Sequence, residues 1–118
     1  MKGAKMANPT VRADEPHFSV RCYQAFRLRV RARVYENTDL MVCCELPSGS
    51  PCHFINTGQS YQLCQRRSQL SPSEITIDFY PQIACNNPGQ TYGLLMQIVA
   101  TNDQGEQGST TVTLDISC

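Results

Sequence analysis

Apolar and polar residues alternate along several short stretches of the chain, and the clearest of these is Val20–Tyr35. From Phe26 to Val34 every second residue is apolar, and the residues between them are arginines. A period of two places the two kinds on opposite faces of a strand, whereas a helical period of 3.6 would scatter both around the surface. We therefore predict a half-buried strand whose exposed face carries an arginine row: Arg27, Arg29, Arg31 and Arg33.

Further strands are predicted between turns that are rich in Gly, Pro, Asn and Ser. Tyr92–Ala100 is apolar on both faces, so we expect it at the centre of a sheet with both faces covered. The others are Leu40–Leu46, Tyr61–Gln65, Ile75–Tyr80 and Val112–Cys118. Short strands joined by frequent turns predict an all-β domain, an antiparallel β-sandwich of the C2-like or immunoglobulin-like kind.

The chain length of 118 residues suits one domain, and a hydrophobic content of 41% argues against disorder. The opening segment 1–15 is polar and lacks the hydrophobic centre of a signal peptide, so we expect a flexible leader or an appended segment there. Residues 16–118 are then expected to form the single β-sandwich domain. No apolar run reaches the roughly 18 residues that a membrane span requires, so none is expected.

Seven cysteines in so short a chain predict disulfide bonds and an extracellular location, as a secreted protein or as the ectodomain of a cell-surface protein. Cys43 and Cys44 are adjacent on one predicted strand, so they point to opposite faces and require different partners. The nearest candidates in the sequence are Cys52 and Cys64, and the strand ends supply the rest: Cys22, Cys85 and Cys118. One cysteine stays unpaired, and a partner in a neighbouring domain is expected for it because Cys118 is the last residue.

Catalytic and metal-binding motifs are not found in the sequence. A nucleophile elbow, a phosphate-binding loop and a carboxylate pair are all missing. Zinc binding by His53 together with the nearby cysteines is the weaker alternative to disulfides, because their spacing does not match the short chelating spacings of zinc sites. We predict a non-enzymatic binding module that uses no metal and no cofactor.

The formal net charge is zero, but eight of the ten Lys and Arg residues lie in residues 1–34. The arginine row has two interpretations: a solubilising strand face, or a binding platform for anionic lipid, sulfated glycan or an acidic protein. Nucleic acid is not expected as a partner, because the row contains no aromatic residues on which bases could stack.

Four segments in order carry a family resemblance. They are Phe26–Val30 with Val34–Asn37; Cys43 and Cys44 with Pro51, Cys52 and Ser60–Arg66; Ile77–Pro81; and Pro88–Ala100. Together they resemble the amino-terminal C2-like (MNNL) domain of Notch ligands of the Delta, Serrate and Jagged family. The second segment is similar to that family's vicinal cysteines followed by an aromatic-x-x-Cys segment that ends in a basic residue.

The resemblance implies a C2-like sandwich at the tip of a cell-surface ligand that contacts a receptor with EGF repeats and, in addition, membrane lipid. It also implies a contact surface in the loop after Phe79, which comprises Tyr80, Pro81 and Gln82. Two other functions stay open. One is an immunoglobulin-, fibronectin- or cadherin-like spacer of an adhesion or matrix protein, favoured by the strand and hairpin 98–105, and the other is a small secreted effector or inhibitor.

Overall fold

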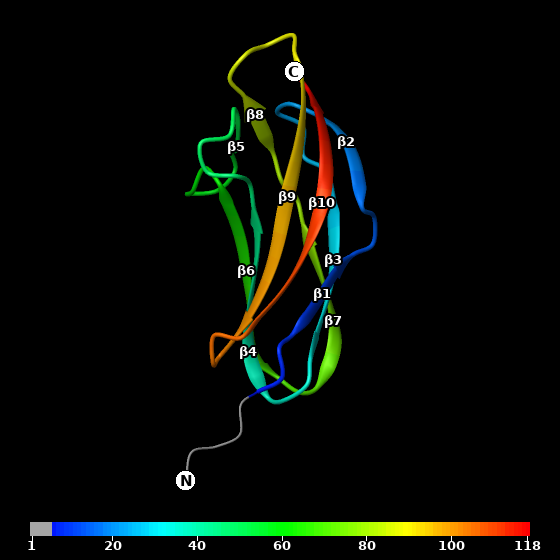
Figure 1. The fold of residues 1–118 in the computed structure, drawn as a ribbon, viewed down its shortest axis with the longest axis vertical. Helices are drawn as coiled ribbons and strands as arrows, with labels where there is room; N and C mark the ends of the chain where they lie inside the picture. Colours follow the sequence, from blue (N-terminus) through cyan, green and yellow to red (C-terminus); the bar gives the residue numbers. More distant parts are fainter. Residues whose placement is uncertain (1–5) are drawn as a thin grey trace.

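The computed structural model describes residues 6–118, which form ten β-strands and no helix (Figure 1). In chain order the strands are β1 (Thr10–Ala13), β2 (His17–Arg21), β3 (Leu28–Val34), β4 (Thr38–Glu45), β5 (Cys52–Phe54), β6 (Gln62–Leu70), β7 (Ser73–Phe79), β8 (Ile83–Cys85), β9 (Thr91–Asn102) and β10 (Gln107–Ser117). Nothing in residues 6–118 is a helix long and apolar enough to cross a membrane. The predicted all-β class is confirmed.

The strands build a sandwich of two sheets with a small third sheet at one end. One sheet has the order β1-β3-β7, the other has the order β2-β10-β9-β4-β6, and β5 pairs with β8 at the end (Figure 1). All neighbouring strands are antiparallel except β2 and β10, which are parallel. Without the short β2, β5 and β8, the first, second and fifth remaining strands share one sheet and the others share the second sheet. The constant-type immunoglobulin fold places its fourth strand with the first, second and fifth, whereas here the fourth remaining strand, β6, pairs with β4 in the other sheet. The chain thus has the two-sheet sandwich architecture with a different distribution of strands.

The core lies between the two large sheets, where it consists of the inward-facing apolar residues that the alternation predicts, and it includes residues of β5 and β8 at one end. Burying one Leu, Ile or Phe side chain contributes about 1.5–3 kcal/mol, so this layer is the main stabilising contribution to the fold. Its largest fully buried members are Leu28, Val30, Leu40, Val42, Ile77, Phe79, Ile83, Met96, Ile98, Val112, Leu114 and Ile116.

The stretch Val20–Tyr35 forms two strands rather than the single strand predicted. Strand β2 pairs with β10 in one sheet, and β3 pairs with β1 and β7 in the other. Between them Tyr23 adopts a left-handed backbone conformation with φ 67°, and the preceding Cys22 is bonded to Cys118. The chain has to turn here because Cys22 is held at the end of β10 while Leu28 enters the opposite sheet.

Strand β1 lies inside segment 1–15, which the sequence sets apart as a leader. Thr10–Ala13 pairs with β3 at four positions, and its apolar side chains contact the core. On the other side, a Cβ at Gly108 would collide with the carbonyl oxygen of Pro9, so β10 can approach this segment so closely only with a glycine there. Four residues are too few for their alternation to be recognised. The folded domain therefore begins before residue 16, and residues 1–5 lie outside the described part.

Strand β9 lies between β10 and β4 in the middle of its sheet, as its apolar character predicts. Its outer face is open to solvent, with Leu95 61% exposed. The expectation that both faces of this strand are covered is therefore wrong. A sandwich of two sheets buries one face of each sheet and leaves the other in water.

Three disulfide bonds confirm the predicted framework: Cys22–Cys118, Cys43–Cys64 and Cys52–Cys85. Cys43 and Cys44 do point to opposite faces of β4, but only Cys43 has a partner, in the facing position on β6. Cys44 is buried in the core as a free thiol. Burial away from water raises the pKa of the Cys44 thiol, so it stays protonated and unreactive. The odd cysteine is thus in the core, and Cys118 is paired within the domain.

Candidate binding surfaces

Three arginines of the row, Arg29, Arg31 and Arg33, lie on the outer face of β3, between β1 and β7, and Arg27 directly precedes the strand. Arg29 donates two hydrogen bonds to the carboxylate of Asp78, from Nε to Oδ1 at 2.9 Å and from Nη2 to Oδ2 at 3.0 Å. The two residues are directly opposite in the register of β3 and β7, so the planar guanidinium meets both carboxylate oxygens. The hydrogen bond lowers the pKa of Asp78 and raises the pKa of Arg29.

Arg31 is paired from the other side of the row, by Asp14 at the end of β1. Its Nε donates to Oδ1 at 2.7 Å and its Nη2 donates to Oδ2 at 3.1 Å. The backbone N–H of Asp14 donates to the carbonyl oxygen of Arg29 at 3.1 Å, which holds the carboxylate beside the row. The hydrogen bond from Arg31 is the main reason why the pKa of Asp14 is lowered. Both central arginines of the row therefore already bind a carboxylate.

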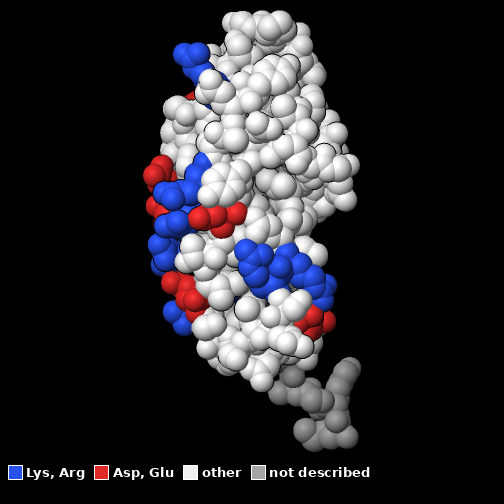
Figure 2. All heavy atoms as spheres, turned by 180° about the vertical axis from the view of Figure 1, so that it is seen from behind, with Lys and Arg blue, Asp and Glu red and all other residues white. Residues whose placement is uncertain are grey.

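Arg27 and Arg33 are at the two ends of the row and take part in no ion pair with another described residue. Arg33 faces Glu74 in the strand register, but the carboxylate of Glu74 accepts a hydrogen bond from Arg12 at 3.4 Å. Basic and acidic atoms accordingly alternate along the left edge of Figure 2, on the side of β1, β3 and β7. The row is a network of ion pairs whose two end members, Arg27 and Arg33, form no ion pair with residues 6–118.

The loop after β7 lies beyond the row, at the end of the molecule that holds β5 and β8. Tyr80 is 55% exposed, Gln82 is half-buried and Pro81 is buried, so contacts are expected from the first two only. The side chain of Asn56 holds the loop in place. Its Nδ2 donates to the carbonyl oxygen of Tyr80 at 2.8 Å, and its Oδ1 accepts the backbone N–H of Gln82 at 3.1 Å.

Two further apolar side chains, Tyr23 and Ile55, are brought to the same loop. Nε2 of Gln82 donates to the carbonyl oxygen of Tyr23 at 3.4 Å, and the backbone N–H of Ile55 donates to the carbonyl oxygen of Gln82 at 3.0 Å. Tyr23 is 66% exposed and Ile55 is 41% exposed. We call Tyr23, Ile55, Tyr80 and Gln82 the aromatic end. The sequence analysis did not identify Tyr23 and Ile55 as surface residues of this loop, because they follow no periodic pattern. The one signal in the sequence was the position of the aromatic Tyr23 directly after Cys22.

The end of the molecule that holds β5 and β8 carries little charge on one face. Figure 2 shows the upper part of the molecule, where β5 and β8 lie, almost free of Lys, Arg, Asp and Glu, while these residues gather over the lower half. Among the six large hydrophobic side chains that the structure shows exposed, three belong to this end. An apolar area of low charge beside a charged area is typical of a surface that contacts another protein.

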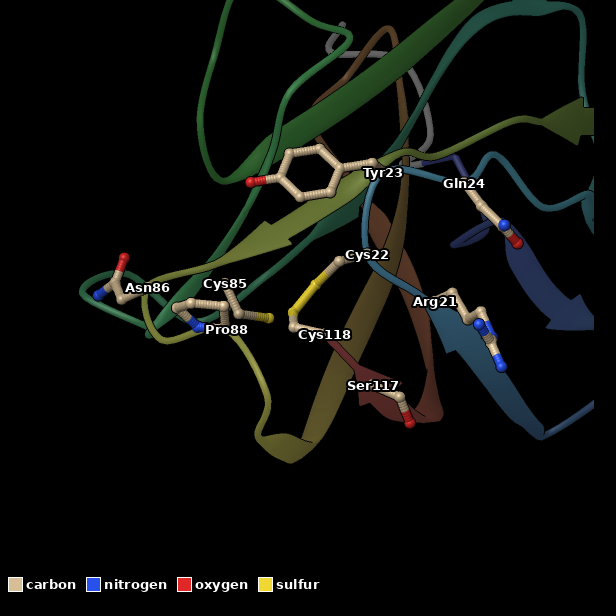
Figure 3. A pocket seen from close by; sticks show the side chains of 9 residues that line it. All are labelled: Arg21, Cys22, Tyr23, Gln24, Cys85, Asn86, Pro88, Ser117 and Cys118. Atoms are coloured by element: carbon tan, nitrogen blue, oxygen red, sulfur yellow. A yellow bond between two sulfur atoms is a disulfide. The ribbon is translucent and has the colours of Figure 1, made fainter.

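A hollow of about 320 Å³ adjoins Tyr23 at the tip of the molecule (Figure 3). The sulfur atoms of Cys22, Cys85 and Cys118 line it and lie within 4.8 Å of one another. Three thiolates at this spacing are the ligands that soft metals prefer. All three sulfur atoms are in disulfide bonds, however, and in this state they offer no thiolate to a metal.

No family model matches the chain, and no curated protein matches its sequence. Similar solved structures include a superoxide reductase (neelaredoxin) from Ignicoccus hospitalis, at 11% identity and a TM-score of 0.46, covering 97% of this chain and 83% of that chain. They also include a non-cellulosomal cohesin from the hyperthermophilic archaeon Archaeoglobus fulgidus, at 12% identity and a TM-score of 0.46, covering 95% and 93% of the two chains. Likeness at this level supports no inference about activity or partners. The resemblance to Notch ligands and the expected lack of enzymatic activity both stay predictions.

Proposed function

We propose that this chain is a non-enzymatic binding module that docks a protein partner through the aromatic end. The supporting observation is the exposure of Tyr23, Ile55 and Tyr80 around one loop. A tyrosine side chain buries a large area at a low cost in conformational entropy, and a few such anchors contribute most of the binding free energy of an interface. Gln82 and Asn56 add hydrogen-bonding groups beside these anchors.

A protein partner fits the surface better than an anionic lipid or a sulfated glycan does. An anion that binds Arg29 or Arg31 has to displace a carboxylate of the same chain, which is held in place at a high effective concentration. Only the two terminal arginines of the row are free of such competition. They support at most a weak attraction that salt screens.

The finer assignment combines the bonds in the structure with the family resemblance. Disulfide bonds are characteristic of oxidising compartments, so we infer an extracellular domain. The resemblance to Notch ligands names a receptor with EGF repeats as the partner, and two of the three contact residues that it implies, Tyr80 and Gln82, belong to the aromatic end. In the alternative, a spacer of an adhesion or matrix protein, the aromatic end has no partner.

The test is a measurement of binding between the oxidised domain and a panel of immobilised receptor ectodomains with EGF repeats. The double variant Tyr23→Ser/Tyr80→Ser should bind at least about 30-fold more weakly, because loss of one interface anchor costs about 2 kcal/mol. Tyr35→Ser is the matched control. Tyr35 is 46% exposed but follows the far end of β3, so its loss should leave the affinity unchanged.

Three results would contradict the proposal in different ways. Equal affinity of the double variant and the wild type removes the aromatic end as the docking surface. Binding that depends on Arg27 and Arg33 instead indicates an anionic partner. Absence of binding across the whole panel rejects the EGF-repeat receptor and favours the spacer.

A further inference from the structure

One disulfide bond and a single cysteine of a second one line the hollow at the tip of the molecule (Figure 3). The first bond joins Cys22 to Cys118, and the second joins Cys52 to Cys85. Sγ of Cys85 lies within 4.8 Å of both sulfur atoms of the Cys22–Cys118 bond, and in Figure 3 its side chain points toward that bond. We call Cys22, Cys85 and Cys118 the sulfur cluster. Its three sulfur atoms are close enough for a thiolate formed at one of them to reach a bond at another after a small side-chain rotation.

The members of these two bonds differ in how easily solvent reaches them. Cys118 is half-buried, Cys22 and Cys85 are each 9% exposed, and Cys52 has no exposed area. The hollow of about 320 Å³ is within the size range of small-molecule sites. A small thiol that enters the hollow therefore meets Cys118 first, and it cannot reach Cys52 at all.

We propose that the sulfur cluster is a thiol–disulfide exchange site, at which a low-molecular-weight thiol becomes bonded to Cys118 and the disulfide moves to Cys22–Cys85. In the first step the external thiolate attacks Sγ of Cys118. A mixed disulfide forms at Cys118, the Cys22–Cys118 bond breaks, and its electron pair leaves with Cys22 as a thiolate.

In the second step the Cys22 thiolate attacks Sγ of Cys85. The Cys22–Cys85 bond forms, the Cys52–Cys85 bond breaks, and Cys52 leaves as a thiolate that takes a proton from water. The number of disulfide bonds is unchanged, because one thiol is consumed and one is released. No oxidant or reductant other than the small thiol is needed.

The exchange acts on the segment that carries the aromatic end, although it does not depend on what that end binds. Cys22 directly precedes Tyr23, whose backbone N–H donates to the carbonyl oxygen of Ile83 at 2.9 Å. Before the exchange Cys22 is tied to the end of β10, and afterwards it is tied to β8. The turn at Tyr23 is thus anchored to a different sheet, while Cys118 carries the thiol.

The first experiment treats the oxidised protein with excess glutathione in the absence of oxygen, stops the reaction with acid and maps the bonds by mass spectrometry. Trypsin with an Asp-specific protease leaves the three cysteines on separate peptides, 22–27, 78–102 and 115–118. We expect glutathione on peptide 115–118 and a new bond between 22–27 and 78–102. Peptide 39–66 holds Cys43, Cys44, Cys52 and Cys64, so fragmentation of this peptide has to locate each modified cysteine. Glutathione at Cys43 or Cys64 should appear about tenfold more slowly than at Cys118, because no second disulfide accepts the freed thiolate there.

A second experiment removes the need for an external thiol. Cys52→Ser leaves Cys85 as a free thiol beside the Cys22–Cys118 bond, so bonds of Cys85 to Cys22 or Cys118 should appear in the isolated protein. Cys64→Ser is the matched control, since it leaves Cys43 free at a place where no other disulfide lies close. The control should keep both bonds of the tip unchanged.

The proposal fails if glutathione modifies all three bonds at equal rates without any new cross-link. It also fails if the wild-type protein forms the mixed disulfide at Cys118 and never the Cys22–Cys85 bond. Retention of Cys22–Cys118 in a folded Cys52→Ser protein, with Cys85 still free, overturns it independently. The wild-type experiment decides the question even if that variant does not fold.

Discussion

The arginine row runs along β3, and the aromatic end lies beyond the end of the row that holds Arg27. The two surfaces differ in how their side chains are satisfied. In the row, Arg29 and Arg31 each meet a carboxylate of the same chain through two hydrogen bonds. At the aromatic end, Tyr23 and Tyr80 are more than half exposed, and hydrogen bonds hold only the backbone beneath them. A row of arginines in a sequence is therefore not necessarily free to bind an anionic partner.

The difference between the arginine row and the aromatic end has a physical reason. A row of like charges on one strand is unfavourable unless acids on the neighbouring strands neutralise it, so the fold supplies the partners. Exposed aromatic side chains contribute nothing comparable to the isolated domain, since their burial requires a second molecule. The row contributes to the stability of the domain, and for this reason we propose the aromatic end, and not the row, as the binding surface.

The largest effect is expected from the bond that holds the aromatic end. Cys52→Ala/Cys85→Ala removes a link across a sequence separation of 33 residues, which should lower the free energy of unfolding by about 3–4 kcal/mol. Urea denaturation measures this loss. Hydrogen exchange should show the backbone of the loop at Tyr80 and Gln82 losing protection first. Cys43→Ala/Cys64→Ala, with a separation of 21 residues, should destabilise the domain without that local effect.

The second prediction turns the row into an anion-binding surface, which is one of the two interpretations that the sequence leaves open. Asp14→Asn/Asp78→Asn removes both bidentate partners and frees Arg29 and Arg31. Retention on phosphatidylserine vesicles at low salt should rise about 30-fold, because each basic residue near such a surface contributes about 1 kcal/mol. Asp103→Asn/Asp115→Asn makes the same change in net charge outside the row. Equal retention of the two variants would show that position on the row is irrelevant.

The third prediction concerns pH. Three carboxyl groups, those of Asp14, Asp39 and Asp78, have a folded-state pKa below the usual 3.8 because they accept hydrogen bonds and lie near arginines. A carboxyl group with a lowered pKa contributes stability that is fully present above the unfolded value of 3.8 and is lost as the pH falls through the folded value. The urea midpoint should therefore stay level above about pH 5 and decline below about pH 4. In Asp14→Asn/Asp78→Asn the decline should be shallower.

The smallest effects are expected at the ends of the row. Arg27→Gln and Arg33→Gln remove cations that have no ion-pair partner among residues 6–118, so the melting temperature should not change measurably. Arg29→Gln leaves Asp78 without its partner and should lower the melting temperature. If all three variants have the same melting temperature, the ion pair of Arg29 with Asp78 does not contribute measurably to the stability of the domain.

Part of the candidate surface could be predicted from the sequence. Alternation correctly placed Arg29, Arg31 and Arg33 on the outer face of β3, with Arg27 directly before the strand, and the resemblance pointed to Tyr80 and Gln82. It could not show that Arg29 is opposite Asp78, because the strand register depends on contacts between distant segments. The sequence pattern also could not predict that Tyr23 and Ile55 lie beside Gln82, because the three residues are in separate turns that no local pattern connects.

The sequence by itself determined the class of fold and the face on which each strand residue lies, because the alternation of side chains along a strand is a local property of the backbone. It also determined that the cysteines form disulfides and that Cys43 and Cys44 point apart. The tertiary structure alone decided which partners meet: Cys22 with Cys118 across a separation of 96 residues, Arg29 with Asp78, and Cys44 with none. Pairing depends on how the sheets register and close, and that is settled only when the whole core packs.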